Sequence, residues 1–435
     1  MKQIKNQGLR PFFLLQAGQF VSLFGSRMTS YSLTLWAYGR SGSVLSLSLL
    51  TVCFLVPSIF FSFLAGGFLD RVDKKKAMLV SDSLSALLTV LLLVLFQAGT
   101  LRVGVLYGVQ FLLGALNAFQ DPAADVAVSF LVEKEDYVRV SGIRSFCISF
   151  TGIFAPMVAG GLYGLLGLRA ILLLDLGTFS FAFLTLLFLV HIPGGTRGGE
   201  REPFGRACLE GLRYLRGQRA ILHLILFMGY VNLVYGFYQC FLPPMVLSRA
   251  GGGEMALAYV NGAIGAAGLC GSLLVSAIGL PRRKVPMMLG LLTVSYGVCN
   301  TLMGLGRHWG VWVLAGFCGQ VLVPFLTSGV DFFMRSRVPG HMQGRVFSAR
   351  NTMQYALLPV GYLLGGVLAD EVLEPFLAGS SRTAQGLSHL VGAGPGSGIA
   401  LGFLLLTAAG ILGMAAFSRD RALRALDDDG EAVDS

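Results

Sequence analysis

Residues Gly66 to Lys76 read G-G-F-L-D-R-V-D-K-K-K, and they lie where one long apolar run (44–69) ends and another (77–96) begins. A short loop with one acid, one arginine and a lysine cluster between two such runs predicts a turn at a membrane surface. The positive-inside rule accounts for the lysines, because basic loops stay in the cytoplasm. It does not account for Asp70, nor for the glycine that precedes it by one helical turn.

The composition is that of a helical membrane protein. Of the 435 residues, 54% are hydrophobic and 13% are charged, whereas charged residues make up about 25% of an ordinary soluble domain. The net charge of +10 comes from basic residues spread over short loops, which indicates membrane topology rather than nucleic-acid binding. The seven cysteines show neither a disulfide framework nor metal-ligand spacing. We therefore expect no metal and no bound cofactor.

Apolar runs of about 20 residues, the length that crosses a bilayer, predict twelve membrane spans. They are expected at 11–38, 44–69, 77–97, 103–130, 141–165, 170–190, 220–247, 255–279, 285–305, 309–331, 346–369 and 397–417. Most of the 33 Lys and Arg residues fall in loops on the side of the amino terminus. This asymmetry predicts a multi-pass protein of the inner (plasma) membrane with both termini in the cytoplasm.

The spans group six and six. We expect an amino-terminal six-helix bundle (1–190), a cytoplasmic linker (191–219), a carboxy-terminal six-helix bundle (220–418) and an acidic cytoplasmic tail (419–435), disordered from Asp427 onward. An internal repeat supports the split, because Arg139-Val-x-x-x-Arg144 recurs as Arg345-Val-x-x-x-Arg350. At the same offset Asp125 matches Asp331, and Gly160 matches Gly366.

The opening stretch resembles the loop between the second and third helices of major facilitator superfamily (MFS) transporters, G-x-x-x-D-R-x-G-R-[RK]. The positions that fall on this pattern are Gly66, Asp70, Arg71, Lys74 and Lys75, and Asp73 replaces its second glycine. Other stretches resemble twelve-helix drug:proton antiporters of the type that includes macrolide and enterobactin exporters. They are Gln19-Phe-Val-Ser-Leu-Phe-Gly-Ser-Arg27, Asp121-Pro-Ala123, Gly344-Arg-Val-Phe-Ser348 and Leu368-Ala-Asp-Glu-Val-Leu-Glu-Pro375. The resemblance runs over nearly the whole chain.

The resemblance implies an all-α membrane protein with the MFS fold, in which twelve transmembrane helices form two pseudo-symmetric six-helix bundles. It implies efflux of amphipathic small molecules by proton antiport and alternating access, driven by the proton gradient. Expected partners are a small-molecule substrate, membrane lipids and protons, with no nucleic acid, and we expect a monomer. The resemblance also implies a cytoplasmic gate, in which Asp70 lies near Gly344 and Arg345, where the dipole of the eleventh helix favours a carboxylate.

Polar residues inside the expected spans are the candidate site residues, since they are costly in hydrocarbon. Gln19, Ser22 and Ser26 recur on one face of the first span, beside Arg27. This face is expected to line the central cavity, with Arg27 holding an anionic group. The alternative is a structural arginine paired within the first bundle.

Four carboxylates are candidates for proton coupling. Asp121 and Asp125 share one face of the fourth span, and nearby carboxylates in a low dielectric favour proton binding. Asp175 lies inside the sixth span and is an equal candidate. A gating or structural role is the alternative for Asp121 and Asp125, and capping of a neighbouring helix is the alternative for Asp175. Asp125 and Asp331 could instead pair with the arginine-bearing loops beyond them.

Two further patterns complete the expected site. The seventh span carries Asn232, Tyr235, Tyr238 and Gln239, an aromatic and amide face that suits bulky amphipathic compounds, or else an ordinary helix contact. A helix-bend motif resembling the antiporter motif G-P-x-x-G-G is expected at Pro156, Gly160 and Gly161, and again at Pro359, Gly365 and Gly366.

Other functions compete with efflux. The same scaffold could import a solute, carry a lipid, or act as a transport-inactive membrane sensor, and a fold alone does not decide among them. No phosphate-binding G-x-x-x-x-G-K-[ST] is present, so ATP is not the expected energy source. The five histidines show no paired metal-ligand spacing, so an enzyme is not expected.

Overall fold

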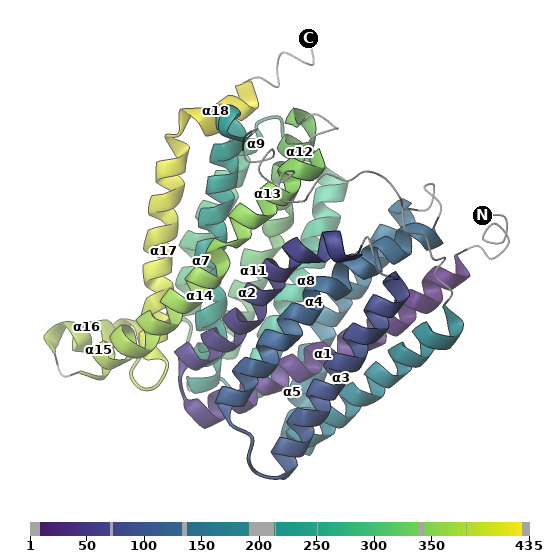
Figure 1. The fold of residues 1–435 in the computed structure, drawn as a ribbon. Helices are drawn as coiled ribbons and strands as arrows, with labels where there is room; N and C mark the ends of the chain where they lie inside the picture. Colours follow the sequence, from purple (N-terminus) through teal and green to yellow (C-terminus); the bar gives the residue numbers. More distant parts are fainter. Residues whose placement is uncertain are drawn as a thin grey trace. The chain divides into compact units, whose positions relative to one another are not determined.

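The structure is a computed structural model that describes residues 9–69, 73–132, 137–190, 213, 215–249, 251–338, 343–379 and 381–428. All regular elements in these ranges are helices (Figure 1). The chain divides into two compact units. The first comprises Met1–Gly42 and Leu49–Phe204, and the second comprises Ser43–Ser48 and Gly205–Ser435.

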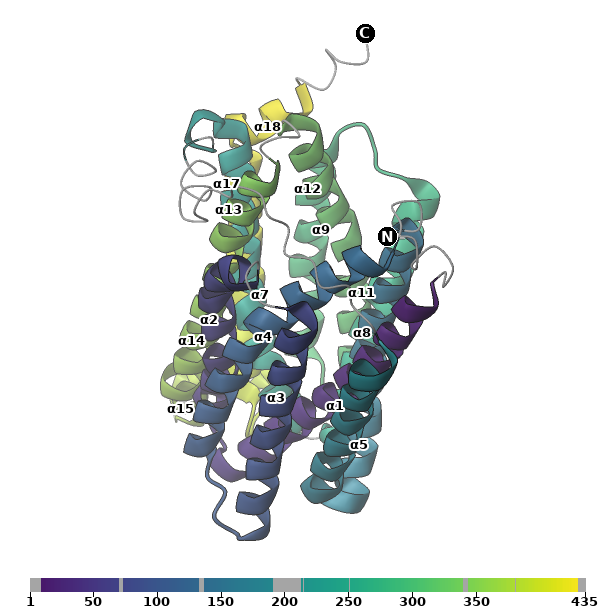
Figure 2. The ribbon, with the colours of Figure 1, turned by 45° about the vertical axis from the view of Figure 1, so that its right-hand side comes forward.

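The first unit is a bundle of long helices. They are α1 (Arg10–Ser41), α2 (Val44–Leu69, from Leu49 onward), α3 (Lys74–Gln97), α4 (Val103–Leu131), α5 (Tyr137–Leu184) and a π-helical turn η2 (Thr185–Leu189). Figure 2 shows α3 and α4 side by side, and α1 packs along α5. Apolar side chains such as Phe12, Met78 and Ala127 fill one end of this bundle.

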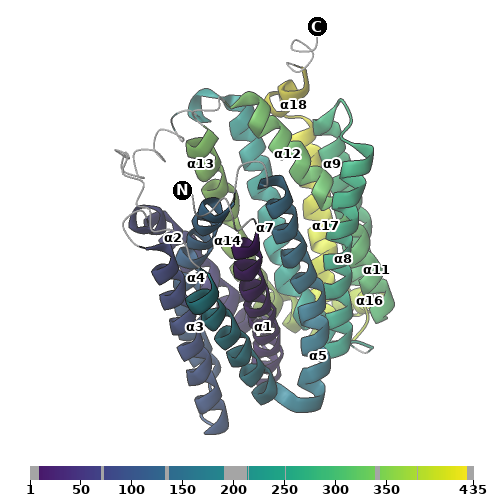
Figure 3. The same cartoon turned by 90° about the vertical axis from the view of Figure 1, so that its right-hand side faces the viewer.

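The second unit contains the remaining helices. They are α7 (Arg219–Ser248), α8 (Glu254–Ile278), α9 (Lys284–Val294), η3 (Ser295–Asn300), α10 (Thr301–Leu305), α11 (Trp309–Val321), α12 (Val323–Arg337), α13 (Gln343–Tyr355), α14 (Leu357–Val367), η4 (Leu368–Leu373), α15 (Glu374–Ala378), α16 (Arg382–Val391), α17 (Ser397–Ser418) and α18 (Arg421–Asp428). Figure 3 shows α8 beside α11, and α14 packs along α7.

Ten helical segments among the described residues are long and apolar enough to cross a membrane. One of them, Phe146–Leu189, covers two of the expected spans. It lies in α5, which breaks at Gly167, where φ is +70°. Glycine adopts this left-handed conformation without the clash that a Cβ would cause. The first expected span forms α1 but is not among the ten, so the count of twelve stays a prediction.

The eleventh expected span is less regular than a single helix. The chain forms α13 and α14 with a break at Ala356, three residues before Pro359. Proline disfavours helical backbone at the residue before it and removes one backbone donor, so a break near it is expected. The connection that follows is itself helical, because η4, α15 and α16 occupy most of it.

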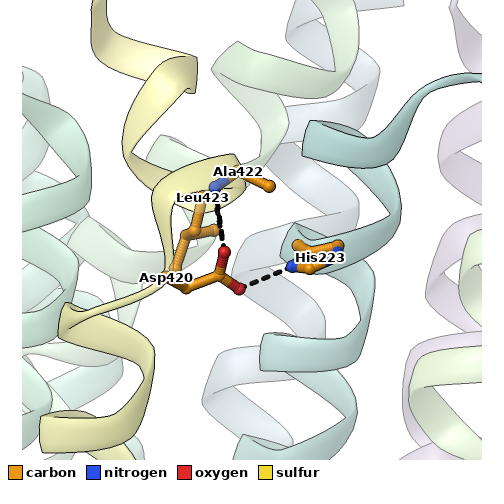
Figure 4. Close-up of polar contacts among 4 residues, drawn as sticks. All are labelled: His223, Asp420, Ala422 and Leu423. Carbon is orange, nitrogen blue, oxygen red and sulfur yellow. Dashed lines mark hydrogen bonds and ion pairs between the residues drawn. The ribbon is translucent and has the colours of Figure 1, made fainter.

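The expected acidic tail begins as an ordered helix. Asp420 accepts hydrogen bonds from the backbone N–H groups of Ala422 (2.9 Å) and Leu423 (3.3 Å), so it caps α18, and its other oxygen lies 2.6 Å from Nδ1 of His223 on α7 (Figure 4). Burial alone raises the pKa of Asp420, but the hydrogen bonds and the charge of His223 outweigh it and hold that pKa below its ordinary value. Leu423 and Leu426 are buried.

Asp427 lies near the end of α18, and its carboxylate contacts the start of another helix. The N–H groups of Lys284 and Val285 donate to its two oxygens at 2.9 Å and 3.0 Å, which caps α9. The expectation of disorder from Asp427 onward is therefore wrong for Asp427 and Asp428, because a capped helix with buried leucines is held by packing. The rest of that segment lies outside the described residues.

Candidate functional site

Asp175 on α5 is a buried carboxylate inside the first unit. Only 2% of its surface is exposed. The hydroxyl of Thr89 on α3 donates to its Oδ2 at 3.5 Å, and the hydroxyl groups of Ser26 and Thr29 on α1 lie beside it. Its Oδ1 has no hydrogen-bond partner among the described residues. Asp175 therefore lies where α1, α3 and α5 meet, surrounded by hydroxyl groups rather than by a cation.

A glycine on α1 makes room for this carboxylate. A Cβ placed on Gly25 would lie 2.1 Å from Oγ1 of Thr178 and 2.9 Å from Oδ1 of Asp175. Both distances are too short for real contacts. The two helices can approach here because position 25 has no side chain, and this close approach fixes the position of Asp175.

The polar face expected along the first span is divided between two environments. Ser22 is buried, whereas Gln19 and Ser26 are half-buried and Arg27 is exposed. The Arg27 guanidinium lies against Gly152 of α5, 3.6 Å from the place a Cβ would occupy. Ser26 lies beside Asp175, while Arg27 lies on the surface of the unit. The expected contact of Arg27 with an anionic group stays a prediction.

An aromatic cluster next to this face was missed by the sequence analysis. Phe150 of α5 contacts Phe20 and Phe24 of α1, with ring centroids 5.7 Å and 6.5 Å away. It also stacks on Phe154 at 4.4 Å and contacts Phe146 at 5.8 Å. Phe146 and Phe154 are exposed. The i, i+4 spacing of the three phenylalanines in α5 was the available signal.

A second buried carboxylate was also missed. Asp82 on α3 is 6% exposed, and its Oδ1 accepts a hydrogen bond from Nε2 of Gln120 on α4 at 2.9 Å. Its Oδ2 and the Oε1 of Gln120 are buried without a hydrogen-bond partner among the described residues. The rule that singled out Asp175 applies equally to Asp82, an acid inside an apolar run.

The other proton-coupling candidates lie in different surroundings. Asp121 is exposed, and the side chain of Asp125 is not among those described. Asp331 on α12 is also exposed and pairs with Arg350 on α13, with Oδ1 3.0 Å from Nη1. For Asp331, the structure therefore contains the alternative pairing with an arginine of the repeated motif. Both exposed acids are poor candidates for holding a proton away from water.

The expected face of α7 contains a stacked tyrosine pair. The rings of Tyr235 and Tyr238 lie 6.3 Å apart and nearly parallel, and Tyr238 meets Phe403 of α17 edge-on at 5.5 Å. Asn232 uses its amide within its own helix, donating to the carbonyl of Met228 at 2.8 Å. Gln239 is half-buried. The tyrosines thus form an aromatic surface that Asn232 does not join.

Much of the gate expected from the opening stretch lies outside the description. Asp70 and Arg71 are not among the described residues, and neither is the side chain of Arg345. The backbone of Gly344 and Arg345 lies in α13, and that of Gly66 lies in α2. Lys74 is buried, and Nζ of Lys75 donates to the carbonyls of Leu187 (2.9 Å) and Val190 (2.7 Å). The gate itself stays a prediction.

Asp73, the departure from the family pattern, has a structural role. Its side chain accepts hydrogen bonds from the backbone N–H groups of Lys75 (2.8 Å) and Lys76 (3.3 Å). Asp73 is therefore the N-cap of α3. A carboxylate in this position satisfies free donors of the first helical turn and interacts favourably with the helix dipole.

The two helix-bend motifs differ in the structure. Pro156 lies within continuous helix in α5, with Gly160 buried and Gly161 half-buried. In α14, Pro359 follows the break at Ala356, and Gly365 and Gly366 are buried. Gly365 packs against Cys240 of α7, and Gly366 against Leu45 at the start of α2. Whether either motif lets helices slide is not tested by these contacts.

Two acids of the segment 368–375 cap helices of the second unit. Asp370 accepts hydrogen bonds from the N–H groups of Val44 (3.1 Å) and Leu45 (2.9 Å) and from the hydroxyl of Ser43 (2.6 Å). Glu374 accepts one from the N–H of Ile399 at 3.1 Å, near the start of α17. These carboxylates accept hydrogen bonds from backbone N–H groups, whereas the donors to Asp82 and Asp175 among the described residues are side chains.

Membrane-length helices that bury carboxylates without counter-charges are typical of membrane transport proteins, in which such residues mark ion or substrate pathways. The sequence agrees with this class. Residues 15–372 match the model of the Major Facilitator Superfamily. The chain belongs to this family of transporters, which confirms the resemblance drawn from its sequence motifs.

Known relatives of the chain include drug exporters. It is 25% identical over 376 residues to macrolide efflux protein A of Streptococcus pyogenes, covering 86% of this chain and 92% of that protein. It is 24% identical over 383 residues to the multidrug efflux pump Tap of Mycobacterium tuberculosis, covering 84% and 89%.

Solved structures of transporters have a similar fold. A POT family transporter in complex with 5-aminolevulinic acid superposes with a TM-score of 0.70 at 11% identity, covering 95% of this chain and 98% of that one. The nucleoside transporter NupG gives a TM-score of 0.65 at 12% identity, covering 94% and 99%. The expectation of an all-α membrane protein with the MFS fold is confirmed.

Proposed function

We propose that this protein is a secondary active exporter of amphipathic small molecules of drug, macrolide or siderophore type, and that it exchanges them for protons by alternating access. Support for export comes from its similarity to a macrolide efflux protein and to a multidrug efflux pump over most of the chain. The burial of Asp175 is the observation that carries the proton exchange.

Asp175 is the proposed proton carrier. A charged carboxylate buried without a cation costs several kcal/mol, so such a group binds a proton or meets a cationic partner during the cycle. Hydroxyl groups from α1 and α3 surround it, and hydroxyl groups can both accept and donate hydrogen bonds. Its surroundings therefore suit both the protonated and the ionised acid. The proton gradient supplies the energy.

Each unit has its own candidate substrate surface of aromatic rings. In the first unit, the phenylalanine cluster around Phe150 lies near the exposed Arg27. In the second unit, Tyr235 and Tyr238 stack beside Phe403. Aromatic rings offer a large contact area with little directional demand, and a few polar groups orient the bound compound. Amphipathic molecules match this combination.

The transporter is proposed to act as a monomer in the inner membrane with both termini in the cytoplasm, its partners being the substrate, lipids and protons. The distribution of Lys and Arg over the loops supports this orientation. Cysteine-accessibility labelling of single cysteines placed near each terminus in intact cells and in inverted vesicles tests it.

The function is tested by measuring compound-driven proton flux. The purified protein is reconstituted in vesicles that enclose a pH-sensitive dye, and a macrolide, a siderophore and a lipophilic cation are added in turn. We expect at least one compound to trigger proton movement. Asp175→Asn should reduce this movement to the level of protein-free vesicles, because the amide cannot carry a proton.

Glu371→Gln is the matched control, since it also removes one acidic charge but at an exposed position. It should leave the flux unchanged. Compound transport without proton movement would refute antiport and favour a uniporter. Full proton flux in Asp175→Asn would refute the assignment of the carrier while leaving antiport intact.

A further inference from the structure

Asp82 is buried and Gln120 is half-buried, and the hydrogen bonding between their side chains is incomplete. The amide of Gln120 donates one hydrogen bond to Oδ1 of Asp82. Oδ2 of Asp82 and Oε1 of Gln120 are both acceptors, and both are buried without a partner among the described residues. Buried polar atoms are rarely left unpaired, so two neighbouring side chains in this condition need an explanation.

One proton would complete the pair. A carboxylic acid and a primary amide can form two hydrogen bonds, one from the amide N–H to the acid and one from the acid O–H to the amide oxygen. The first of these bonds is present. The atoms that the second would join are Oδ2 of Asp82 and Oε1 of Gln120, the two that lack partners. A proton on Oδ2 supplies the donor that the pair is missing.

The charges on the surrounding helices do not replace that proton. Gln120 is the one side chain hydrogen-bonded to Asp82 among the described residues, and no ion pair to Asp82 occurs among them. Among the described side chains, the charged groups on α3 and on the helices packed against it are Lys74, Lys75 and Lys76 on α3, Asp121 on α4, and Arg144, Arg169 and Asp175 on α5, while the side chains of Asp125 on α4 and Arg139 on α5 lie outside the description. An ionised Asp82 would be a buried charge without compensation, which is costly.

The position of Asp82 along α3 connects it to Asp175. Asp82 and Thr89 are seven residues apart, which places them on one face of the helix about 10.5 Å apart along its axis. Thr89 is the residue of α3 that donates to Asp175. Ser85 lies between them on that face. A polar stripe of Asp82, Ser85 and Thr89 thus runs along α3 from Asp82 toward Asp175.

We propose that the Asp82–Gln120 pair is a second proton-binding site, which relays protons between Asp175 and the end of α3 that carries Lys74. Asp82 binds the proton, and Gln120 is a positioning residue that orients the carboxyl group. The use of this proton in transport rests on the proposed function. The binding of a proton to Asp82 does not rest on that function, because it is argued from the contacts of the Asp82–Gln120 pair alone.

Infrared spectroscopy of the whole reconstituted protein tests the proposal, since a protonated carboxyl group has a carbonyl stretch that a carboxylate lacks. Without any added compound at neutral pH, we expect Asp82→Asn to lose one such band. Gln120→Leu should shift that band without removing it, because the acid would lose its amide partner. Glu371→Gln should leave every band in place, since its carboxyl group is exposed.

Several outcomes separate this proposal from the proposed function. An unchanged spectrum in Asp82→Asn would overturn the second site. Loss of the band in that variant, with no compound driving proton flux in the wild-type protein, would support the site and overturn antiport. If Asp82→Asn fails to fold, Gln120→Leu decides the matter, because a band that neither shifts nor changes intensity would overturn the pairing.

Discussion

The two units use their acidic residues differently. In the first, Asp82 and Asp175 lie buried within helices, and among the described residues each has one oxygen without a hydrogen-bond partner and no ion pair. In the second, Asp370, Glu374 and Asp427 each accept hydrogen bonds from backbone N–H groups at the start of a helix. Helix starts satisfy a carboxylate as an anion. Under the proposed function, Asp82 and Asp175 exchange protons, whereas these three acids of the second unit cap helices.

One acid of the first unit follows the pattern of the second. Asp73 caps α3, but it precedes that helix and is exposed. The distinction therefore depends on where the carboxylate lies, and not on which unit carries it. This can be tested by changing acids of each kind.

The largest expected difference is between Asp175→Asn and Glu374→Gln. The first should abolish compound-triggered proton flux. The second should keep the flux, because glutamine still accepts a hydrogen bond from Ile399, while lowering the temperature of unfolding. Flux and thermal unfolding would be measured on the same preparations. Loss of flux in a well-folded Glu374→Gln would remove the distinction between the two kinds of acid.

Next in size is the effect of a methyl group at Gly25. Gly25→Ala should destabilise the first unit by about 1–3 kcal/mol, because its Cβ would clash with Thr178 and press on Asp175. Gly39→Ala on the same helix is the control, since nothing lies within 4 Å of the added atom, and it should be neutral or stabilising. Denaturant unfolding of both variants measures the difference. Equal effects would show that α1 and α5 do not meet as described.

A smaller effect is expected from the cap of α9. Asp427→Ala should cost about 1 kcal/mol, the usual value of an N-cap side chain. Proton flux should persist, since Asp427 lies outside the spans. Hydrogen exchange of the Lys284 and Val285 amides provides the measurement, and both should exchange faster in the variant. Unaltered exchange would contradict the cap.

The smallest effect concerns Asp420 and its contact with His223. Because the pKa of folded Asp420 lies below the ordinary value of 3.8, its stabilising contribution is complete above 3.8 and is lost as the pH falls from there through the lower pKa of the folded protein. The contribution should be about 1 kcal/mol or less, as for partly exposed pairs. The free energy of unfolding of the wild type and of Asp420→Asn, measured at neutral and at acidic pH, checks this. The two values should converge in acid. A difference in the free energy of unfolding that is the same at both pH values would contradict the lowered pKa of Asp420.

The sequence predicted the family and the helical class well, because apolar run length and the loop from Gly66 to Lys76 are local signals. It also identified Asp175 as an acid inside a span. Asp82 obeys the same rule, but it follows the lysine cluster that opens α3 by only six residues, so the charged loop masks its signal in the sequence. On α4, the neighbouring acid Asp121 was selected, whereas Gln120 makes the buried contact.

Other features depend on partners that are distant in sequence. Asp370 and Leu45 are 325 residues apart, and Asp427 and Lys284 are 143 residues apart. No local sequence pattern therefore predicts either helix cap. The fit of Gly25 against Thr178 likewise depends on how two helices pack. Pro359 was a local signal for a bend in this helix, and the bend motif was predicted from it. The signal did not give the residue at which the helix breaks, Ala356.

The cap of α9 has a consequence for the order in which the protein is made. Asp427 leaves the ribosome 143 residues after Lys284, a delay of roughly 7 to 30 seconds at ordinary rates of translation. During that interval the first N–H groups of α9 must rely on water or lipid headgroups. The start of α9 therefore matures late, and a pulse-chase proteolysis experiment should find this segment sensitive until α18 has emerged.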